Sequence, residues 1–126
     1  MINVLLVGAG GALGAMARYG ITIGVGRLLT QPTFPWGIMV ANVGGSLIIG
    51  VLAGVGDSRH VFSTEARLFL FIGLLGGFTT FSSITNETLA LMRAGSYLSA
   101  LTNVGLTLAL GLAAVGVGYV AGKAGA

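Results

Sequence analysis

The residues that could do chemistry are concentrated in one polar segment inside an apolar stretch. Between Leu75 and Glu87 the chain carries two adjacent glycines, then threonines, serines and an asparagine. Adjacent glycines and β-branched threonines weaken a helix, and this segment belongs to a run of 19 uncharged residues, Leu68 to Asn86. We therefore expect a helix break whose carbonyls can hold a cation and whose hydroxyls can donate to an anion: Thr80, Ser82, Ser83 and Thr85. A merely kinked helix whose hydroxyls bond their own carbonyls is the alternative.

Further polar residues interrupt other apolar runs. Asn42 follows Trp36 by six residues in an otherwise apolar segment, and its amide can donate two hydrogen bonds. Asn103 and Thr107 are four residues apart, so on a helix they share one face that would point into a bundle. The alternative for each of these residues is a purely structural hydrogen bond between helices.

Two charged residues also fall within apolar runs. Arg18 would cost about 2.5 kcal/mol or more at the centre of a membrane, so it must either extend to the interface or line an aqueous vestibule for an anion. Glu87 follows the polar segment, and we expect it to bond a helix end or pair with a basic neighbour.

The composition argues against an enzyme and against nucleic-acid binding. The chain has no cysteine, one histidine (His60) and three acidic residues, so neither a nucleophile–base pair nor a metal-ligand cluster can be assembled. Its six basic residues are spread along the chain and form no patch. Gly8, Gly11 and Gly14 resemble a dinucleotide-binding loop, but the acidic residue needed about 20 positions later is missing.

The elements that position these residues must be membrane helices. Of 126 residues, 55% are hydrophobic and only 7% are charged, which is too few charges for a water-exposed surface. We expect an all-α membrane protein with a single membrane domain, 1–126, and four transmembrane helices. Their expected ranges are about 3–28, 36–56, 66–93 (broken near 76–81) and 96–122, with a turn at Gln31, Pro32 and Pro35.

Glycines at helical spacing predict how these helices pack. In lipid, close backbone contact through small residues four apart supplies the attraction between helices. Four such pairs occur: Gly10 and Gly14, Gly20 and Gly24, Gly50 and Gly54, and Gly118 and Gly122.

Three motifs, taken in order, carry a family resemblance over nearly the whole chain. They are Gly10 to Ala15 with Arg18 and Tyr19, then Trp36-Gly37 with Ala41 to Gly45, then Gly76 to Ser82 with Glu87 and Thr88. In these motifs the chain resembles the Fluc (CrcB) family of fluoride channels.

The resemblance implies an antiparallel, dual-topology homodimer with two fluoride pores and a sodium ion at the dimer centre. In the family, main-chain carbonyls that map to Gly76 and Thr79 of both subunits bind the sodium. The fluoride path maps to Asn42 and Phe81, with the polar positions of the fourth helix, Asn103 and Thr107, along it. A ring edge is positive and can hold an anion weakly enough to release it.

One position departs from the family pattern. The family has a second phenylalanine three residues after the first, where this chain has Ile84. Isoleucine has no polarised ring edge, so we expect weaker fluoride binding beside this residue.

The function that the resemblance implies is passive fluoride export through a multi-pass protein of the bacterial inner membrane, with the lipid bilayer and a second copy as partners. Similar numbers of basic residues on the two expected sides are compatible with dual insertion. Two alternatives are a small proton-coupled drug exporter and a non-transporting scaffold subunit. The exporter needs a carboxylate in its first helix, where none occurs, and the scaffold leaves the polar segment unexplained.

Overall fold

The four apolar runs fold as helices long enough to cross a membrane. The computed structural model describes residues 1–29 and 34–125, and the expected turn residues Gln31 and Pro32 lie outside them. Within these ranges the candidate membrane spans are α1 (Ile2–Leu28), α2 (Trp36–Arg59), a composite third span (Thr64–Arg93) and α6 (Tyr97–Gly125). The expectation of an all-helical chain with four candidate membrane spans is confirmed for this part of the chain.

The third span is built from four pieces. It comprises α3 (Thr64–Arg67), the π-helical η1 (Leu68–Leu75), α4 (Gly76–Phe78) and α5 (Phe81–Arg93). The span begins at Ser63, whose hydroxyl accepts a hydrogen bond from the Ala66 amide at 3.1 Å, as a helix N-cap does. Two non-helical residues, Thr79 and Thr80, separate α4 from α5.

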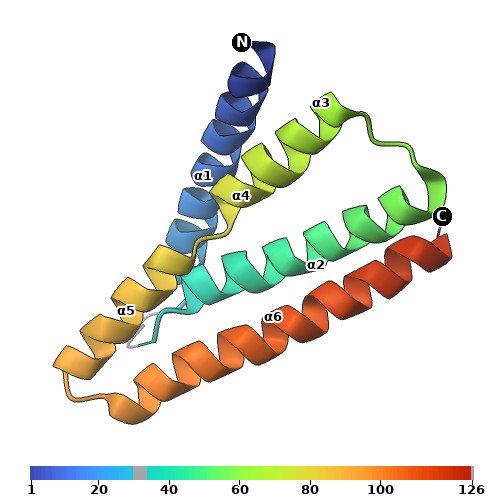
Figure 1. Ribbon diagram of the computed structural model, residues 1–126. Helices are drawn as coiled ribbons and strands as arrows, with labels where there is room; N and C mark the ends of the chain where they lie inside the picture. The colour runs from blue at the N-terminus through green and yellow to red at the C-terminus, as the bar shows by residue number, and fades with distance from the viewer. Residues whose placement is uncertain (30–33, 126) are drawn as a thin grey trace.

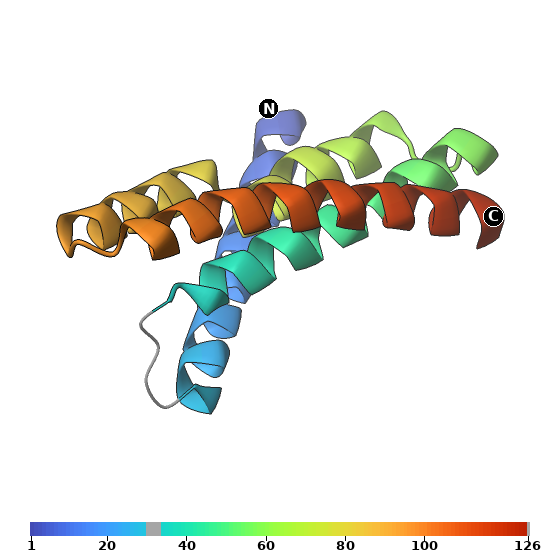
Figure 2. The same cartoon turned by 90° about the horizontal axis from the view of Figure 1, so that it is seen from below.

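The spans pack mainly as two pairs, α2 with α6 and α1 with the first half of the third span. Helices α2 and α6 lie side by side and run in the same direction, while the third span returns beside them (Figure 1). Helix α1 crosses the others at a steep angle, as Figure 2 shows. It contacts η1 and α4, whereas α5 contacts α6. The two halves of the third span therefore pack against different helices.

Glycines bring α2 and α6 into backbone contact. A β-carbon at Gly50 or Gly54 would collide with the main chain of Val115 or Tyr119 on α6. Gly118 and Gly122 meet the backbone of α2 in the same way, at Leu47 and Val51. This contact is the small-residue packing that lipid-embedded helices require.

A second glycine contact joins α1 to the third span. Gly10 and Gly14 lie against the backbone around Leu74, and Gly77 lies against the backbone of Gly11. Gly76 and Gly77 were expected to disrupt the helix, but both are helical and belong to α4. The close approach of α1 explains why position 77 is a glycine, and the chain leaves the helix only at Thr79.

The remaining glycine pair, Gly20 and Gly24, meets no other helix in the described part of the chain. Within the described residues, no atom lies within 4 Å of a β-carbon built at Gly20 or Gly24. Large apolar side chains are exposed on all four spans, as lipid-facing surfaces require. The buried apolar residues are few: Ile38, Met39, Ala41, Leu75, Phe78 and Ala100.

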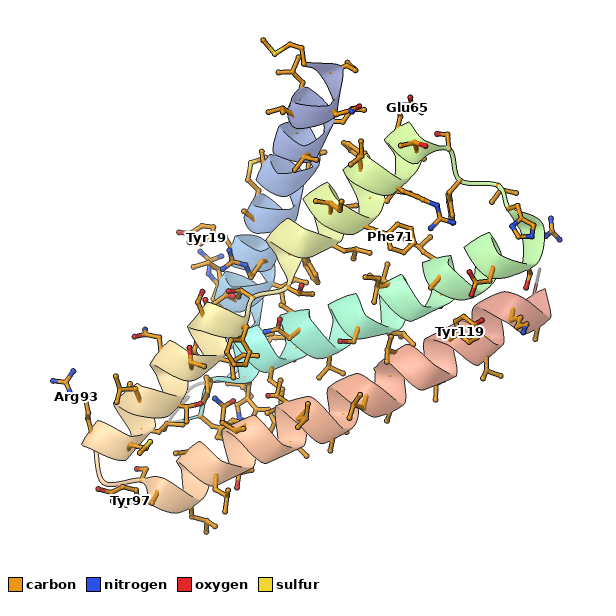
Figure 3. All side chains as sticks on the ribbon, viewed as in Figure 1. Tyr19, Glu65, Phe71, Arg93, Tyr97 and Tyr119 are labelled. Carbon is orange, nitrogen blue, oxygen red and sulfur yellow. The ribbon has the colours of Figure 1, made fainter. Side chains whose placement is uncertain are left out.

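Helix α2 extends three residues beyond its expected end. Residues 57–59, which lie beyond the expected range of 36–56, continue the helix, which ends where His60 adopts the left-handed conformation with φ 53°. The extension is supported by the Tyr119 hydroxyl, which donates to the Asp57 carboxylate at 2.8 Å. Figure 3 shows Tyr119 on α6 beside this end of α2.

Candidate functional site

Thr79 and Thr80 form an extended segment between α4 and α5, which we call the Thr79–Thr80 segment. Thr79 has φ −97° and ψ 147°, and Thr80 has φ −152° and ψ 121°. Thr80 also caps α5, because its hydroxyl accepts a hydrogen bond from the Ser83 amide at 3.4 Å. In Figure 1 this segment is the short non-helical link between α4 and α5.

Asn42 of α2 is buried against the Thr79–Thr80 segment. Its Oδ1 accepts a hydrogen bond from the Thr80 amide at 2.7 Å. Its Nδ2 donates to the Thr80 carbonyl at 3.4 Å and to the Ile38 carbonyl of its own helix at 3.0 Å. The side chain therefore bonds both main-chain groups of Thr80.

These bonds change the partners of the carbonyls beside the segment. In a continuous helix the Thr80 amide would donate to Gly76 and the Ser83 amide to Thr79. Among the residues that the structure describes, neither bond forms, because those amides donate to the side chains of Asn42 and Thr80 instead. The carbonyls of Gly76 and Thr79 thus lack their usual donors and remain available as neutral oxygen ligands, which suit a hard cation such as Na⁺.

Arg18 of α1 bonds the carbonyl of Gly77, the residue that follows Gly76. Its Nε donates to the Gly77 carbonyl at 3.2 Å, and the side chain is half-buried. The sequence left two alternatives for Arg18, contact with the membrane interface or lining of an anion vestibule. In the structure its side chain bonds the third span. This contact holds a desolvated charge beside an acceptor, which lowers its cost in the membrane.

A cavity of about 460 Å³ opens beside the segment, between α2, the third span and α6. Seven of the residues that the sequence singled out line it: Asn42, Gly76, Thr79, Thr80, Phe81, Ile84 and Thr107. The Phe81 side chain is 79% exposed, so its ring edge is free for contact with an ion or another chain. Within the described residues, the buried Thr107 hydroxyl has no hydrogen-bond partner.

Five other predicted site residues lie outside this lining. Ser82 and Ser83 flank it, with their hydroxyls 3.1 Å and 3.5 Å from that of Thr80. Thr85 donates its hydroxyl to the Ser82 carbonyl of its own helix at 2.9 Å. Asn103, which is 2% exposed, donates to the Thr88 hydroxyl at 3.0 Å. The fifth is Arg18, which bonds Gly77.

Among the other cavity residues, two have a polar or aromatic side chain that the sequence had not singled out. Ser46 lies one turn after Asn42, and its hydroxyl donates to the Asn42 carbonyl at 2.9 Å. Its polar type and spacing of four were the signal that could have found it. Phe71 of η1 points toward α2 (Figure 3) and also lines the cavity. A phenylalanine in an apolar run looks like a lipid contact, so it gave no signal.

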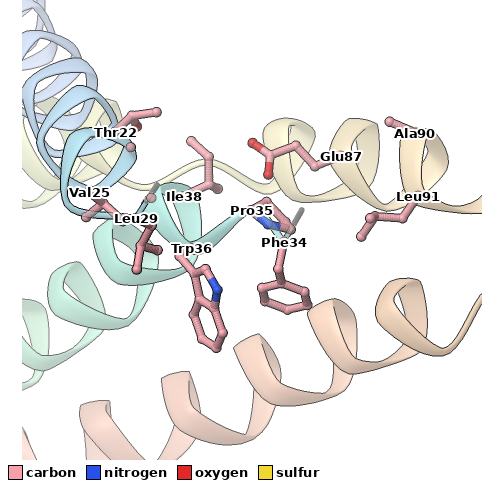
Figure 4. A pocket seen from close by; sticks show the side chains of 12 residues that line it. Thr22, Val25, Leu29, Phe34, Pro35, Trp36, Ile38, Glu87, Ala90 and Leu91 are labelled. Atoms are coloured by element: carbon pink, nitrogen blue, oxygen red, sulfur yellow. The ribbon is translucent and has the colours of Figure 1, made fainter. Parts of the chain in front are cut away.

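A second, smaller cavity of about 370 Å³ lies at the other end of α5, against the end of α1 and the start of α2. Glu87 points from α5 toward the start of α2 there, near Pro35 and Ile38 (Figure 4). Within the described residues, its buried Oε2 has no hydrogen-bond partner, in contrast to the expected bond or ion pair.

The fold and the site define a four-span α-helical membrane protein whose polar groups gather beside a non-helical point in its third span. A sequence profile of the family described as "CrcB-like protein, Camphor Resistance (CrcB)" matches residues 5–119. The chain therefore belongs to the CrcB-like protein family.

Curated relatives match nearly the same length. A protein of Parabacteroides distasonis is 45% identical over 123 residues, covering 98% of this chain and 94% of the relative. A Nitrobacter winogradskyi protein is 47% identical over 97 residues, 77% of this chain and 76% of the relative. A Shewanella putrefaciens protein is 44% identical over 118 residues, 94% of each chain. All three are named fluoride-specific ion channel FluC.

Proposed function

We propose that this chain is a fluoride-selective ion channel through which fluoride leaves the cell passively, and that it is not an enzyme. The observation that carries this proposal is the 45% identity, over 98% of the chain, to a protein named fluoride-specific ion channel FluC. The chemistry of the site agrees, because fluoride in a pore needs hydrogen-bond donors and weakly positive edges in place of its water shell. Hydroxyls and a free phenylalanine ring adjoin the cavity.

The fluoride path is assigned to Asn42 on α2 and to the ring edge of Phe81, the positions that the family resemblance indicates. The hydroxyls of Thr80, Ser82 and Ser83 are further donors on the third span. On α6 the path includes Thr107, whose buried hydroxyl is unpaired within the described residues, and Asn103. Arg18 belongs to the vestibule. Ile84 occupies a position where the family has phenylalanine, so conduction is weakened there.

The functional unit is an antiparallel, dual-topology homodimer in the bacterial inner membrane. Two features support a second copy: the exposed Phe81 ring beside an open cavity, and the unpaired glycine face at Gly20 and Gly24. Basic residues are nearly balanced between the two membrane sides, which supports insertion in both orientations.

A structural sodium ion is assigned to the dimer centre, where the third span acts as a broken helix. The Gly76 and Thr79 carbonyls would hold it, and their lack of amide donors within the described residues supports this assignment. When bound, the ion supplies a fixed positive charge that holds two third spans together. The chain's own contribution is to present these carbonyls.

The physiological role follows from the acid chemistry of fluoride. Neutral HF crosses membranes, ionises in the more alkaline cytoplasm and becomes trapped as the anion, which the channel releases. A proton-coupled drug exporter is disfavoured, because α1 lacks the carboxylate that such a transporter uses in its first helix.

Anion efflux from liposomes tests the channel directly. Vesicles containing the purified chain are loaded with fluoride or chloride, and efflux is followed by ion-selective electrodes in the presence of a potassium ionophore. We expect rapid fluoride loss without chloride loss. Equal loss of both anions, or no loss from either the parent chain or Ile84→Phe, would overturn the proposal.

A further inference from the structure

The contact between Asn42 and Thr80 has the form of a main-chain pairing made by a side chain. A side-chain amide carries the same donor and acceptor as a peptide group. Asn42 uses both on one residue, with its Oδ1 on the Thr80 amide at 2.7 Å and its Nδ2 near the Thr80 carbonyl at 3.4 Å. Asn42 therefore pairs with Thr80 as an adjacent strand would, and this pairing competes with helix continuation.

This pairing determines which carbonyl is left free. The Thr80 amide is the donor that Gly76 would have in an uninterrupted helix, and Asn42 takes it. A carbonyl without a donor is costly at the depth of the membrane hydrocarbon. The cost is offset when the oxygen binds a cation, so an intact Asn42 contact and a bound cation stabilise the same backbone conformation.

Arg18 acts on the neighbouring carbonyl. Its Nε donates to Gly77 at 3.2 Å, from a helix whose backbone meets Gly77 at Gly11. The bond supplies a donor to the Gly77 carbonyl, in the last helical turn before the Thr79–Thr80 segment. It also fixes the plane of that peptide, which in turn limits the orientation of the adjacent Gly76 carbonyl.

We propose that Asn42 and Arg18 are positioning residues for the cation site, which keep the Gly76 and Thr79 carbonyls available by bonding the main chain around them. The proposal rests on the sodium site of the proposed function. It also gives Asn42 a role other than that of a fluoride donor. Its amide hydrogens already serve the carbonyls of Ile38 and Thr80.

The test measures sodium-dependent stability, not flux. The Tm of the purified full-length chain in detergent is compared in sodium chloride and in N-methylglucamine chloride at equal ionic strength, without fluoride. Asn42→Leu removes the pairing at similar side-chain size, and Arg18→Met removes the guanidinium but keeps an apolar stem. Asn103→Leu and Arg27→Met are the matched controls, because Asn103 is also a buried asparagine and, among the described residues, its amide donates to Thr88, away from the site.

We expect sodium to raise the Tm of the parent and of both controls, and most of this rise to be lost in Asn42→Leu and in Arg18→Met. Asn42→Asp keeps an acceptor for the Thr80 amide and should retain the rise, which keeps the test decisive if Asn42→Leu does not fold. Retention of the full rise in Asn42→Leu or Arg18→Met, or its loss in Asn42→Asp, would overturn the proposal.

The same data separate this inference from the channel proposal. A parent chain that conducts fluoride but shows no sodium-dependent Tm would overturn the positioning role and leave the channel standing. A sodium-dependent Tm that needs Asn42 and Arg18, in a chain without fluoride flux, would support the positioning role while the channel proposal fails.

Discussion

At the scale of single residues, Phe81 and Ile84 lie one turn apart on α5 and both line the larger cavity. A second ring at position 84 would add an anion contact of about 0.5–1.5 kcal/mol, the usual value of a favourable aromatic interaction. We expect Ile84→Phe to raise fluoride efflux about two- to tenfold, measured as the initial rate per protein in liposomes. Ile84→Leu is the control without a ring edge, and an equal gain in both variants would contradict the argument.

His60 ends α2 in a conformation that suits glycine better than histidine. With φ 53°, its β-carbon is crowded by the backbone, whereas glycine adopts this conformation without strain. We expect His60→Gly to stabilise the chain by about 0.5–1 kcal/mol, seen as a higher Tm in detergent. His60→Ala retains the β-carbon and should show no gain.

At the scale of elements, the contact between α2 and α6 depends on glycines that face backbone. A β-carbon at Gly50 would collide with the Val115 carbonyl, while one at Gly44 on the same helix meets nothing within 4 Å among the described residues. We expect Gly50→Ala to destabilise the chain by about 1–3 kcal/mol, as overpacking does. Gly44→Ala should be neutral or stabilising, because alanine favours the helix. Thermal unfolding in detergent measures both, and equal effects would show that this contact is not limiting.

The spans could be predicted from sequence because their signal is local. Uncharged runs such as Leu68 to Asn86 identify membrane helices from composition alone. What could not be predicted is which residue leaves the helix. Local propensity gave only the range of about 76–81, in which Gly76 and Gly77 are helical whereas Thr79 and Thr80 are not.

The point at which the third span leaves the helix is set by a contact between residues far apart in sequence. Asn42, 38 residues away in sequence, takes the Thr80 amide, and only the packing of α2 against the third span brings the two together. The polar residues of the site could thus be identified by type, but their partners could not. Asn42 was singled out by its polar type, but its contact with Thr80 was not predicted, and neither was the contact of Arg18 with Gly77.

At the scale of the whole molecule, four spans that each cross the membrane once would place Met1 and Gly125 on one side and the turn between α5 and α6 on the other. The chain contains no cysteine, so a single introduced thiol reports orientation cleanly. In cells, we expect Ala94→Cys to react with a membrane-impermeant maleimide in about half of the copies, as near-equal basic flanks imply. Val117→Cys, in the middle of α6, should not react, and complete labelling or complete protection of Ala94→Cys would contradict dual insertion.

The glycine contacts between the spans also explain how a chain with 23 glycines keeps one fold. In water, glycine weakens a helix because its backbone has the most conformational entropy to lose. In a bilayer that loss occurs at insertion, since the hydrogen-bonding needs of the backbone impose the helix whatever the sequence. When the inserted helices then pair, glycine has no side-chain rotamers to be fixed, so the contact costs no side-chain entropy. The residue that is least favourable for a soluble helix is therefore among the least costly for joining two membrane helices.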